Sequence, residues 1–174
     1  MIKRLCEDYD IFMFDLDRTV FDTYSKSGEP IWAKQMIKPL VQIGNNIIKD
    51  DCESNCYLQP GVRSVLKYLY SKNKKVGFIS RGGVYDVEYN EQPSVLLLRK
   101  FGVYKYFTYA KFMFYKTEVK AGHLSQFGKC VFFDDMDKDL EAAREIGGVK
   151  VIDRKKFNRW RELLWKTNHH TRIV

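Results

Sequence analysis

Residues 11–14 form a continuous apolar run, and two carboxylates, Asp15 and Asp17, follow it directly. A short apolar run of this kind is typical of a strand that is buried on both faces of a sheet. Side chains two residues apart in an extended chain point to the same side, so Asp15 and Asp17 are predicted to converge where the strand ends. Two acids at such a place repel each other, and a cation or a shared proton would relieve the repulsion. An acidic surface turn after the strand explains the pair alone equally well.

Two further apolar runs, residues 76–79 and residues 131–133, also end in polar side chains. The residues that follow these runs are Ser80, Arg81, Asp134 and Asp135. Lys116 lies between the two runs in the sequence. In an open α/β sheet, binding sites form beyond the carboxyl ends of the strands. The three strand ends are therefore predicted to build one site for phosphate or metal.

The order of these residues resembles the four motifs of the haloacid dehalogenase-like hydrolases, over about residues 8–153. The matching residues are Asp15-Leu-Asp17-Arg-Thr19, Ser80, Lys116 and Asp134-Asp135. The resemblance implies an α/β fold, a Rossmann-like three-layer sandwich with a mostly parallel sheet. The closer likeness is to the magnesium-dependent phosphatase group, whose pattern also contains Phe-Asp-Leu-Asp, Ser-Arg and Phe-Phe-Asp-Asp.

This resemblance implies a phosphatase that needs Mg²⁺ and hydrolyses phosphoric monoesters through an aspartyl-phosphate. Asp15 would be the nucleophile and a metal ligand. Asp17 would be the general acid and then the general base, and its backbone carbonyl would also bind the metal. Asp135 matches a residue that binds the metal directly. Asp134 would belong to the same metal site and support the residues that bind the ion.

The resemblance also assigns Ser80 and Lys116 to the transferring phosphoryl group. Lys111 and Lys120 are rivals for the role of the lysine. Lys111 falls inside a predicted strand and Lys120 inside a predicted helix, whereas Lys116 lies at the junction between them. Arg81, beside Ser80, is either a substrate contact or a surface charge.

Two acids beyond the third apolar run, Asp137 and Asp139, fall where a helix is predicted to begin. Acids in the first turn of a helix interact favourably with the helix dipole, and this is the preferred explanation of Asp137. Asp139 lies four residues beyond Asp135 and is expected to orient the metal-binding acids.

The rest of the chain alternates between helical and strand patterns, which favours a mostly parallel sheet with right-handed crossovers. Helices are predicted over residues 61–71, 93–101, 117–127, 137–146 and 155–166, and further strands over residues 106–114 and 149–152. The first of these helices has apolar residues at positions 62, 65, 66 and 69, which is the spacing of one buried face.

Residues 22–60 separate the first strand from the first long helix and are predicted to form a small flap or cap insertion. The whole chain, residues 1–174, is predicted to be a single domain. Within the insertion, residues 31–43 could hold a short helix, and residues 46–49 and 56–59 could pair as a hairpin. In the superfamily that the chain resembles, insertions at this place cover the active site, and one this short leaves the pocket open.

No apolar run approaches the roughly 20 residues of a membrane span. Acids also interrupt the N-terminal residues before a signal-peptide core could form, so a cytoplasmic protein with no membrane partner is expected. The four cysteines do not suggest a disulfide framework in a chain of this length. A zinc site built from Cys52, Cys56, His169 and His170 would match no standard spacing, and loop cysteines with a polar tail explain these residues better.

The net charge of +8 favours acidic partners, and a phosphorylated small molecule or a phosphoprotein would satisfy it. Lys155, Arg159 and Lys166 would form a basic stripe on the outer face of the last predicted helix. A nucleic-acid end phosphatase is therefore an alternative function, although a solvated basic face explains the stripe too. A second alternative is a binding or regulatory module that keeps the fold without turnover.

Overall fold

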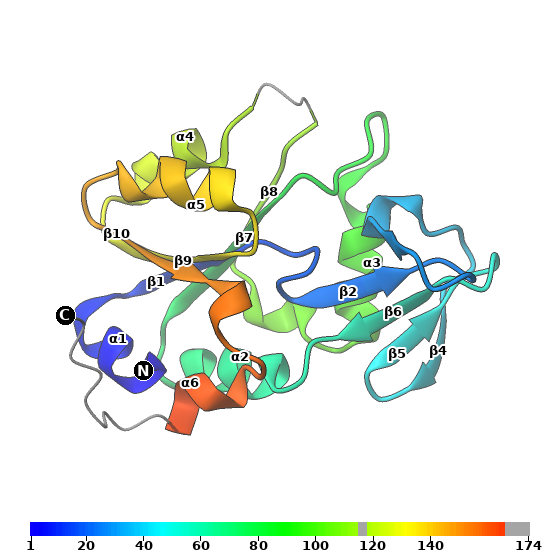
Figure 1. Cartoon of the computed structure of the whole chain (residues 1–174), viewed down its shortest axis with the longest axis horizontal. Coiled ribbons are helices and arrows are strands. Elements are labelled where there is room, and N and C mark those ends of the chain that lie inside the picture. Colours follow the sequence, from blue (N-terminus) through cyan, green and yellow to red (C-terminus); the bar gives the residue numbers. More distant parts are fainter. Residues whose placement is uncertain (115–117, 166–174) are drawn as a thin grey trace.

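The structure, a computed structural model, describes residues 1–114 and 118–165, with only the backbone of Trp165, and the statements below refer to these residues. Its centre is a five-stranded sheet in the order β10-β9-β1-β7-β8 (Figure 1). The strands are β1 (Ile11–Phe14), β7 (Lys75–Ser80), β8 (Tyr109–Phe112), β9 (Cys130–Asp134) and β10 (Val149–Asp153). All neighbouring strands pair in parallel. The apolar run that sequence analysis placed on both faces of a sheet is the central strand, β1.

Helices cover both faces of this sheet (Figure 1). One layer contains α1 (Ile2–Asp8), α2 (Val62–Ser71), α3 (Pro93–Lys100) and α6 (Arg161–Trp165), and the other contains α4 (Lys120–Leu124) and α5 (Asp137–Arg144). Successive side chains of a strand point to opposite faces. Phe12 and Phe14 of β1 therefore enter the core of the first layer, whereas Met13 enters the core of the second. The predicted α/β three-layer sandwich is confirmed.

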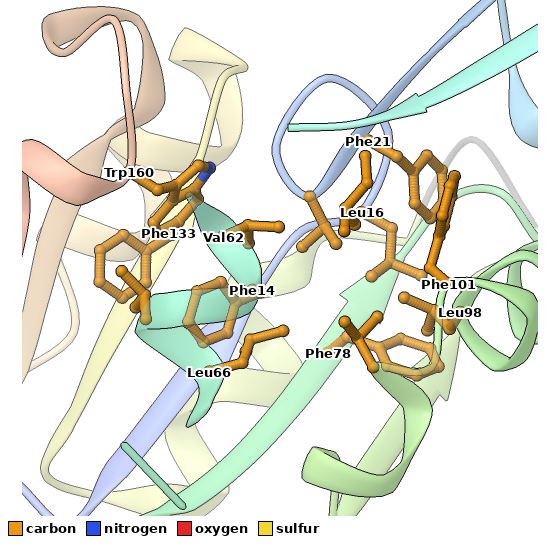
Figure 2. Close-up of a cluster of buried hydrophobic side chains, with 14 of the residues drawn as sticks. Phe14, Leu16, Phe21, Val62, Leu66, Phe78, Leu98, Phe101, Phe133 and Trp160 are labelled. Atoms are coloured by element: carbon orange, nitrogen blue, oxygen red, sulfur yellow. The ribbon is translucent and has the colours of Figure 1, made fainter. Parts of the chain in front are cut away.

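An aromatic stack fills the first core at the end of β1 (Figure 2). Phe14 stacks on Phe133 with the ring centroids 4.7 Å apart. The ring of Trp160 lies 5.5 Å from that of Phe14 and 5.2 Å from that of Phe133. Trp160 is fully buried although it precedes α6. The stack therefore joins the C-terminal segment to the central strand.

Residues 21–58 fold as a second, antiparallel sheet in the order β3-β2-β6-β5-β4 (Figure 1). Its strands are β2 (Phe21–Tyr24), β3 (Pro30–Ile31), β4 (Val41–Gly44), β5 (Ile47–Lys49) and β6 (Asn55–Leu58). The predicted hairpin is confirmed, since Ile48 of β5 pairs with Cys56 of β6. This sheet coincides with the predicted insertion, and its buried side chains, such as Phe21, belong to the first core. Its role as a flap in a single domain stays a prediction.

The helix expected within residues 31–43 is wrong except for one short turn. The chain forms a 3₁₀ turn, η1 (Ala33–Gln35), and then the strand β4. Pro39 has no backbone N–H to donate, which disfavours a helix across it. The side chain of Gln35 closes the turn by accepting a hydrogen bond of 2.7 Å from the Trp32 backbone N–H.

Two elements around residues 104–127 are shorter than predicted. The strand expected over residues 106–114 is confined to β8, because the chain before it forms the 3₁₀ turn η3 (Tyr104–Tyr106). The helix expected over residues 117–127 is confined to α4, followed by the 3₁₀ turn η4 (Ser125–Phe127). Gly122 lies inside α4, and a glycine in a helix interior weakens the helix.

The helix predicted over residues 155–166 is wrong in its first half. Residues Arg154–Lys156 form a 3₁₀ turn, η5, and α6 begins only after Trp160. Phe157 has an extended backbone (φ −147°, ψ 141°), and the Trp160 backbone N–H donates to the carbonyl of Pro60 at 3.1 Å. Packing on the rest of the molecule has replaced the local helix.

The basic stripe that depended on this helix is not formed in the described part of the chain. Lys155 lies in η5 and Arg159 precedes α6, so they do not share a helical face. The ammonium of Lys155 is paired with the carboxylate of Asp137 at 2.7 Å. Lys166 lies outside the described residues.

The zinc site that was considered in the sequence has no support in the described residues. Cys52 is exposed, whereas Cys56 is buried and its Sγ accepts a hydrogen bond from the Thr23 hydroxyl at 3.6 Å. His169 and His170 lie outside the described residues.

Within residues 1–114 and 118–165, none of the helices has the length and apolar composition that crossing a bilayer requires. The cytoplasmic location stays a prediction.

Candidate active site

The carboxyl ends of β1, β7 and β9 meet at one edge of the parallel sheet. The pairing register places Phe14, the last residue of β1, beside Phe78 of β7 and Phe133 of β9. The predicted site residues at these three strand ends are Asp15, Asp17, Ser80 and Asp134. All four side chains are buried. The structure therefore brings together the residues that the sequence placed at separate strand ends.

A tight loop after β1 carries the two aspartates into the second sheet. Arg18 has a left-handed backbone conformation (φ 62°), and its N–H donates to the carbonyl of Phe21 at 2.7 Å. The carbonyl of Thr19, the last residue of the sequence motif, accepts a hydrogen bond of 3.0 Å from the indole N–H of Trp160. The C-terminal segment thus fixes this loop through the hydrogen bond from Trp160 to Thr19.

Asp15, Asp134 and Asp135 form an acidic cluster. Each offers one carboxylate oxygen, and these oxygens all lie within 4.8 Å of one another. Asp15 and Asp134 are buried and Asp135 is half-buried. Oxygen donors at this spacing are what a hard divalent cation such as Mg²⁺ prefers, so the residues present fit a metal site.

The protonation of these acids reflects how far they are removed from water. Burial raises the pKa of Asp15 to about 7, and the charges of Asp17 and Asp135 act in the same direction against the opposing charge of Lys120. Burial also raises the pKa of Asp134 to about 7, with the charge of Asp15 adding to it. The cluster holds more negative charge than its neighbours neutralise, which favours a cation there.

Lys120, at the start of α4, is the cation of the site. Its ammonium donates to Asp15 Oδ1 at 2.6 Å and to Asp134 Oδ2 at 2.7 Å, and it lies 3.6 Å from Asp139 Oδ2. Only 1% of its side chain is exposed. Burial alone would lower the pKa of Lys120, but the charges of these carboxylates raise it, so the lysine stays charged. The favoured lysine of the sequence motif, Lys116, lies outside the described residues, and the structure places its rival Lys120 in the site.

Asp139 connects Lys120 to Arg81. The Arg81 guanidinium donates to Asp139 Oδ1 at 2.6 Å and to Asp139 Oδ2 at 3.3 Å, and also to the Glu118 carbonyl at 2.8 Å. Asp139 is buried, and that it orients the acidic cluster stays a prediction. Asp137 is exposed and paired at the surface, away from these groups.

Asp17 is hydrogen-bonded by the turn η1, between two strands of the second sheet, and not by the acidic cluster. Its Oδ1 accepts a hydrogen bond of 2.8 Å from the backbone N–H of Ala33, in the turn η1. Its buried Oδ2 has no hydrogen-bond partner among the described residues. Burial raises the pKa of Asp17 to about 6, against the hydrogen bond from Ala33 and the charges of Lys120 and Lys34. A carboxyl that can carry a proton near neutral pH is suited to general acid catalysis.

Gly82 leaves room for a group of polar atoms beside Asp17. A Cβ at this position would lie 2.8 Å from Asp17 Oδ2 and 3.1 Å from both Ser80 Oγ and Ser94 Oγ. The Gly82 backbone N–H donates to Ser80 Oγ at 3.0 Å. The hydroxyl proton of Ser80 is therefore available to another acceptor.

Sequence reasoning missed Ala33, Gly82 and Ser94. Ala33 contributes through its backbone, so its side chain carries no signal in the sequence. The Gly82-Gly83 pair after a strand end was a usable signal, because glycine permits close approach of the backbone to other groups. Ser94 lies one residue inside α3, where a serine is unremarkable by position.

Comparisons with known proteins show the fold. No protein-family model matches the chain, and no curated protein matches its sequence. A phosphatase candidate from Clostridium difficile has 15% identity and a TM-score of 0.55, with 90% of each chain covered. A haloacid dehalogenase-like family hydrolase from Streptococcus pneumoniae has 15% identity and a TM-score of 0.53, covering 91% of this chain and 90% of that one.

A third solved structure gives the same result. A predicted phosphoglycolate phosphatase from Haemophilus somnus has 16% identity and a TM-score of 0.53, covering 83% of this chain and 84% of that one. At this level of identity the likeness is one of fold. The chain has the fold of the haloacid dehalogenase-like hydrolases, as the motif residues implied.

Proposed function

We propose that this protein is a phosphatase of the haloacid dehalogenase type, a Mg²⁺-dependent phosphomonoesterase that works through an aspartyl-phosphate on Asp15. The observation that carries the proposal is the buried contact of Asp15 with Lys120, beside the oxygens of Asp134 and Asp135. A carboxylate nucleophile, a fixed cation and a set of oxygen ligands are the parts that phosphoryl transfer to an aspartate needs.

Asp15, Asp134 and Asp135 would hold the metal ion. When bound, Mg²⁺ would neutralise charge as the anionic nucleophile meets the anionic phosphate. That the backbone carbonyl of Asp17 is a further ligand stays a prediction from the family resemblance.

In the first step, the Asp15 carboxylate attacks phosphorus and the bond from phosphorus to the leaving oxygen breaks. Lys120 occupies Asp15 Oδ1, so Oδ2 is the attacking atom. The leaving oxygen takes a proton from Asp17, which is separately held by Ala33. In the second step a water molecule attacks the aspartyl-phosphate, Asp17 takes a proton from that water, and phosphate leaves.

Two groups would hold the transferring phosphoryl group. Ser80 Oγ accepts from Gly82 and can donate its own proton to a phosphoryl oxygen. Lys120 has one ammonium proton left after its two short hydrogen bonds, to Asp15 and to Asp134. Both interactions strengthen as charge develops on the phosphoryl oxygens.

The test is hydrolysis of 4-nitrophenyl phosphate by the whole protein. We expect turnover with Mg²⁺, loss of turnover with EDTA, and loss in Asp15→Asn. The matched control is Asp137→Asn, which makes the same carboxylate-to-amide change at an exposed position and should retain activity. A beryllium fluoride adduct on Asp15 should be detectable by ¹⁹F NMR in the wild type and absent in Asp15→Asn. Turnover that survives both EDTA and Asp15→Asn contradicts the mechanism.

The non-catalytic module is the main competing class. A protein that binds Mg²⁺ but cleaves no member of a panel of phosphomonoesters, phosphopeptides and nucleic-acid ends would support it. The nucleic-acid alternative stays a prediction. The helix that was to carry the basic stripe begins only at Arg161, so Lys155 and Arg159 do not lie on it.

A further inference from the structure

A cavity of about 350 Å³ opens beside the candidate active site. Its walls come from the turn η1, the ends of β7 and β8, and the start of α5. A volume of this size lies at the lower end of the range for small-molecule pockets, enough for one ring and its substituents.

The backbone of η1 links this cavity to Asp17. Ala33 is buried and its N–H holds Asp17 Oδ1, while its neighbours Trp32 and Lys34 line the cavity. On the opposite side, Arg81 lines the cavity and contacts Asp139, which lies beside Lys120. The cavity is therefore connected to Asp17 through one residue of η1 and to Lys120 through Asp139.

One part of the wall is apolar and aromatic. It contains Trp32, Met113, Phe114 and Met136. Phe114 is 44% exposed. Its ring packs edge-on against that of Tyr85, with the ring centroids 6.2 Å apart. It also lies so close to Gly83 that a Cβ there would be 2.7 Å from the Phe114 ring. A fixed, partly exposed ring beside a polar site offers a surface for a flat apolar group.

The other part of the wall is cationic. Arg81 is neutralised by Asp139, but the exposed Lys34 and Lys138 form no ion pair with any described residue. No acid lines the cavity among the described residues. Two unmatched ammonium groups attract an anion that is separate from the phosphate being transferred.

We propose that this cavity receives the leaving group, and that the preferred substrates are small phosphomonoesters whose leaving group combines an aromatic ring with a second anionic group. Trp32 and Phe114 contact the ring, and Lys34 and Lys138 contact the second anion. This inference rests on the proposed phosphatase function of the same site.

The charge requirement is tested by the ratio of kcat/KM for 3-carboxyphenyl phosphate to that for phenyl phosphate. We expect the ratio to be about tenfold in the wild type, the combined effect of two exposed ion pairs. It should fall close to one in the double variant Lys34→Gln with Lys138→Gln. The charge of Lys34 also lowers the pKa of Asp17, so its loss changes kcat/KM for any substrate. This change is the same for both substrates and cancels in the ratio.

The matched controls are Lys155→Gln and Lys67→Gln. Lys155 lines a second cavity, of about 290 Å³, whose wall includes Asp135, and Lys67 is exposed on α2. Neither should change the ratio. A ratio of one in the wild type, or a ratio that the double variant leaves unchanged, overturns the inference. A ratio that falls in Lys155→Gln but not in the double variant also overturns the inference, because it places the leaving group in the cavity of about 290 Å³.

The ring requirement has its own variant. Phe114→Ala should lower kcat/KM about tenfold for both aryl phosphates and leave glycerol 2-phosphate unchanged. Equal losses for all three substrates would contradict a ring contact at Phe114.

A binding measurement separates failure of this inference from failure of the proposed function. Calorimetric titration with 3-carboxybenzylphosphonate, which cannot be hydrolysed, should show tighter binding than benzylphosphonate, and the double lysine variant should abolish the difference. If this selectivity is found without turnover of any phosphate, the phosphatase proposal fails, and only the preference of the cavity for an aromatic anion is retained. If turnover is found without selectivity, the phosphatase proposal holds and the cavity inference fails.

Discussion

Lys120 is the residue on which the electrostatics of the site depend. It is buried among Asp15, Asp134 and Asp139, and it is the cation that contacts all three in the described part of the chain. Removing one partner from a buried set of charges is costly, because the groups that remain are desolvated and uncompensated. The same geometry places its ammonium against Asp15, the proposed nucleophile.

Two variants distinguish the lysine of the site from its neighbour in the sequence. Lys120→Gln should lower kcat by about 10²- to 10³-fold, the usual effect of removing a group that stabilises transition-state charge. Lys116→Gln should lower kcat far less. The measurement is turnover of 4-nitrophenyl phosphate at saturating Mg²⁺, with circular dichroism to show that both variants are folded. The reverse order of effects would return the role to Lys116.

At this scale the sequence predicted that the acids and the serine would lie together at the strand ends, whereas it favoured Lys116, which lies outside the described residues, over Lys120. Asp15, Asp17, Ser80 and Asp134 each follow an apolar run, and the end of a strand is easy to locate from such a run. The lysine depends on where a helix begins, and periodicity places that boundary only to within about a turn.

Among the elements, the turn η1 has the clearest functional consequence. It is a single 3₁₀ turn, closed by the side chain of Gln35, and it presents the N–H of Ala33 to Asp17, the proposed general acid. The sequence predicted a longer helix there, because the pairing of β4 with β5 involves partners that local pattern does not reveal. The insertion therefore contributes a hydrogen bond to the chemistry as well as a wall to the cavity.

Ala33→Pro tests this contact by removing the backbone N–H, and it also adds two ring carbons at a buried position. Proline is tolerated at the first position of a helical turn, and the extended backbone of Trp32 (φ −89°, ψ 145°) suits the residue before it. We expect kcat to fall about tenfold, the worth of a hydrogen bond to a charged group. The fall should be larger for glycerol 2-phosphate than for 4-nitrophenyl phosphate, whose better leaving group needs less protonation. The control Ala33→Gly keeps the N–H, and an equal loss in both variants would contradict the role of the hydrogen bond.

In the C-terminal segment the sequence predicted correctly which side chains are buried, but it predicted the wrong backbone conformation. Phe157, Trp160 and Leu164 have helical spacing, and Phe157 and Trp160 are indeed buried. The backbone reaches these positions through a 3₁₀ turn, an extended residue and then α6. Spacing in the sequence indicates which side chains face the core, but long-range contacts such as that of Trp160 with Pro60 decide the path.

For the molecule as a whole, Trp160 connects the C-terminal segment to the central sheet and to the loop after β1, residues 15–20. Its ring packs on Phe14 and Phe133 (Figure 2). Its indole N–H donates to the buried carbonyl of Thr19. The loop that carries Asp15 and Asp17 is thus fixed by a residue far away in the sequence. Stability and activity should therefore fall together when this contact is lost.

Trp160→Phe keeps a ring in the core but removes the indole N–H. Leaving the Thr19 carbonyl without its partner should lower the free energy of unfolding by about 1–3 kcal/mol, measured by urea titration. The control Trp32→Phe, at a half-buried position in the cavity wall, should cost less stability. No change in the unfolding free energy of Trp160→Phe would show that the hydrogen bond does not hold the loop.

The central position of β1 has a consequence for how the protein is made. Both strands that flank it follow it in the chain, so Phe12 leaves the ribosome well before Val76 and Val131 exist to pair with it. At about 5–20 residues per second, the nascent chain exposes this apolar strand for several seconds. The antiparallel sheet, whose strands all lie within residues 21–58, can assemble in that interval. Trp160 is translated later still, so Asp15 is present early in synthesis, but the hydrogen bond from Trp160 to the loop that carries it can form only when the C-terminal segment emerges.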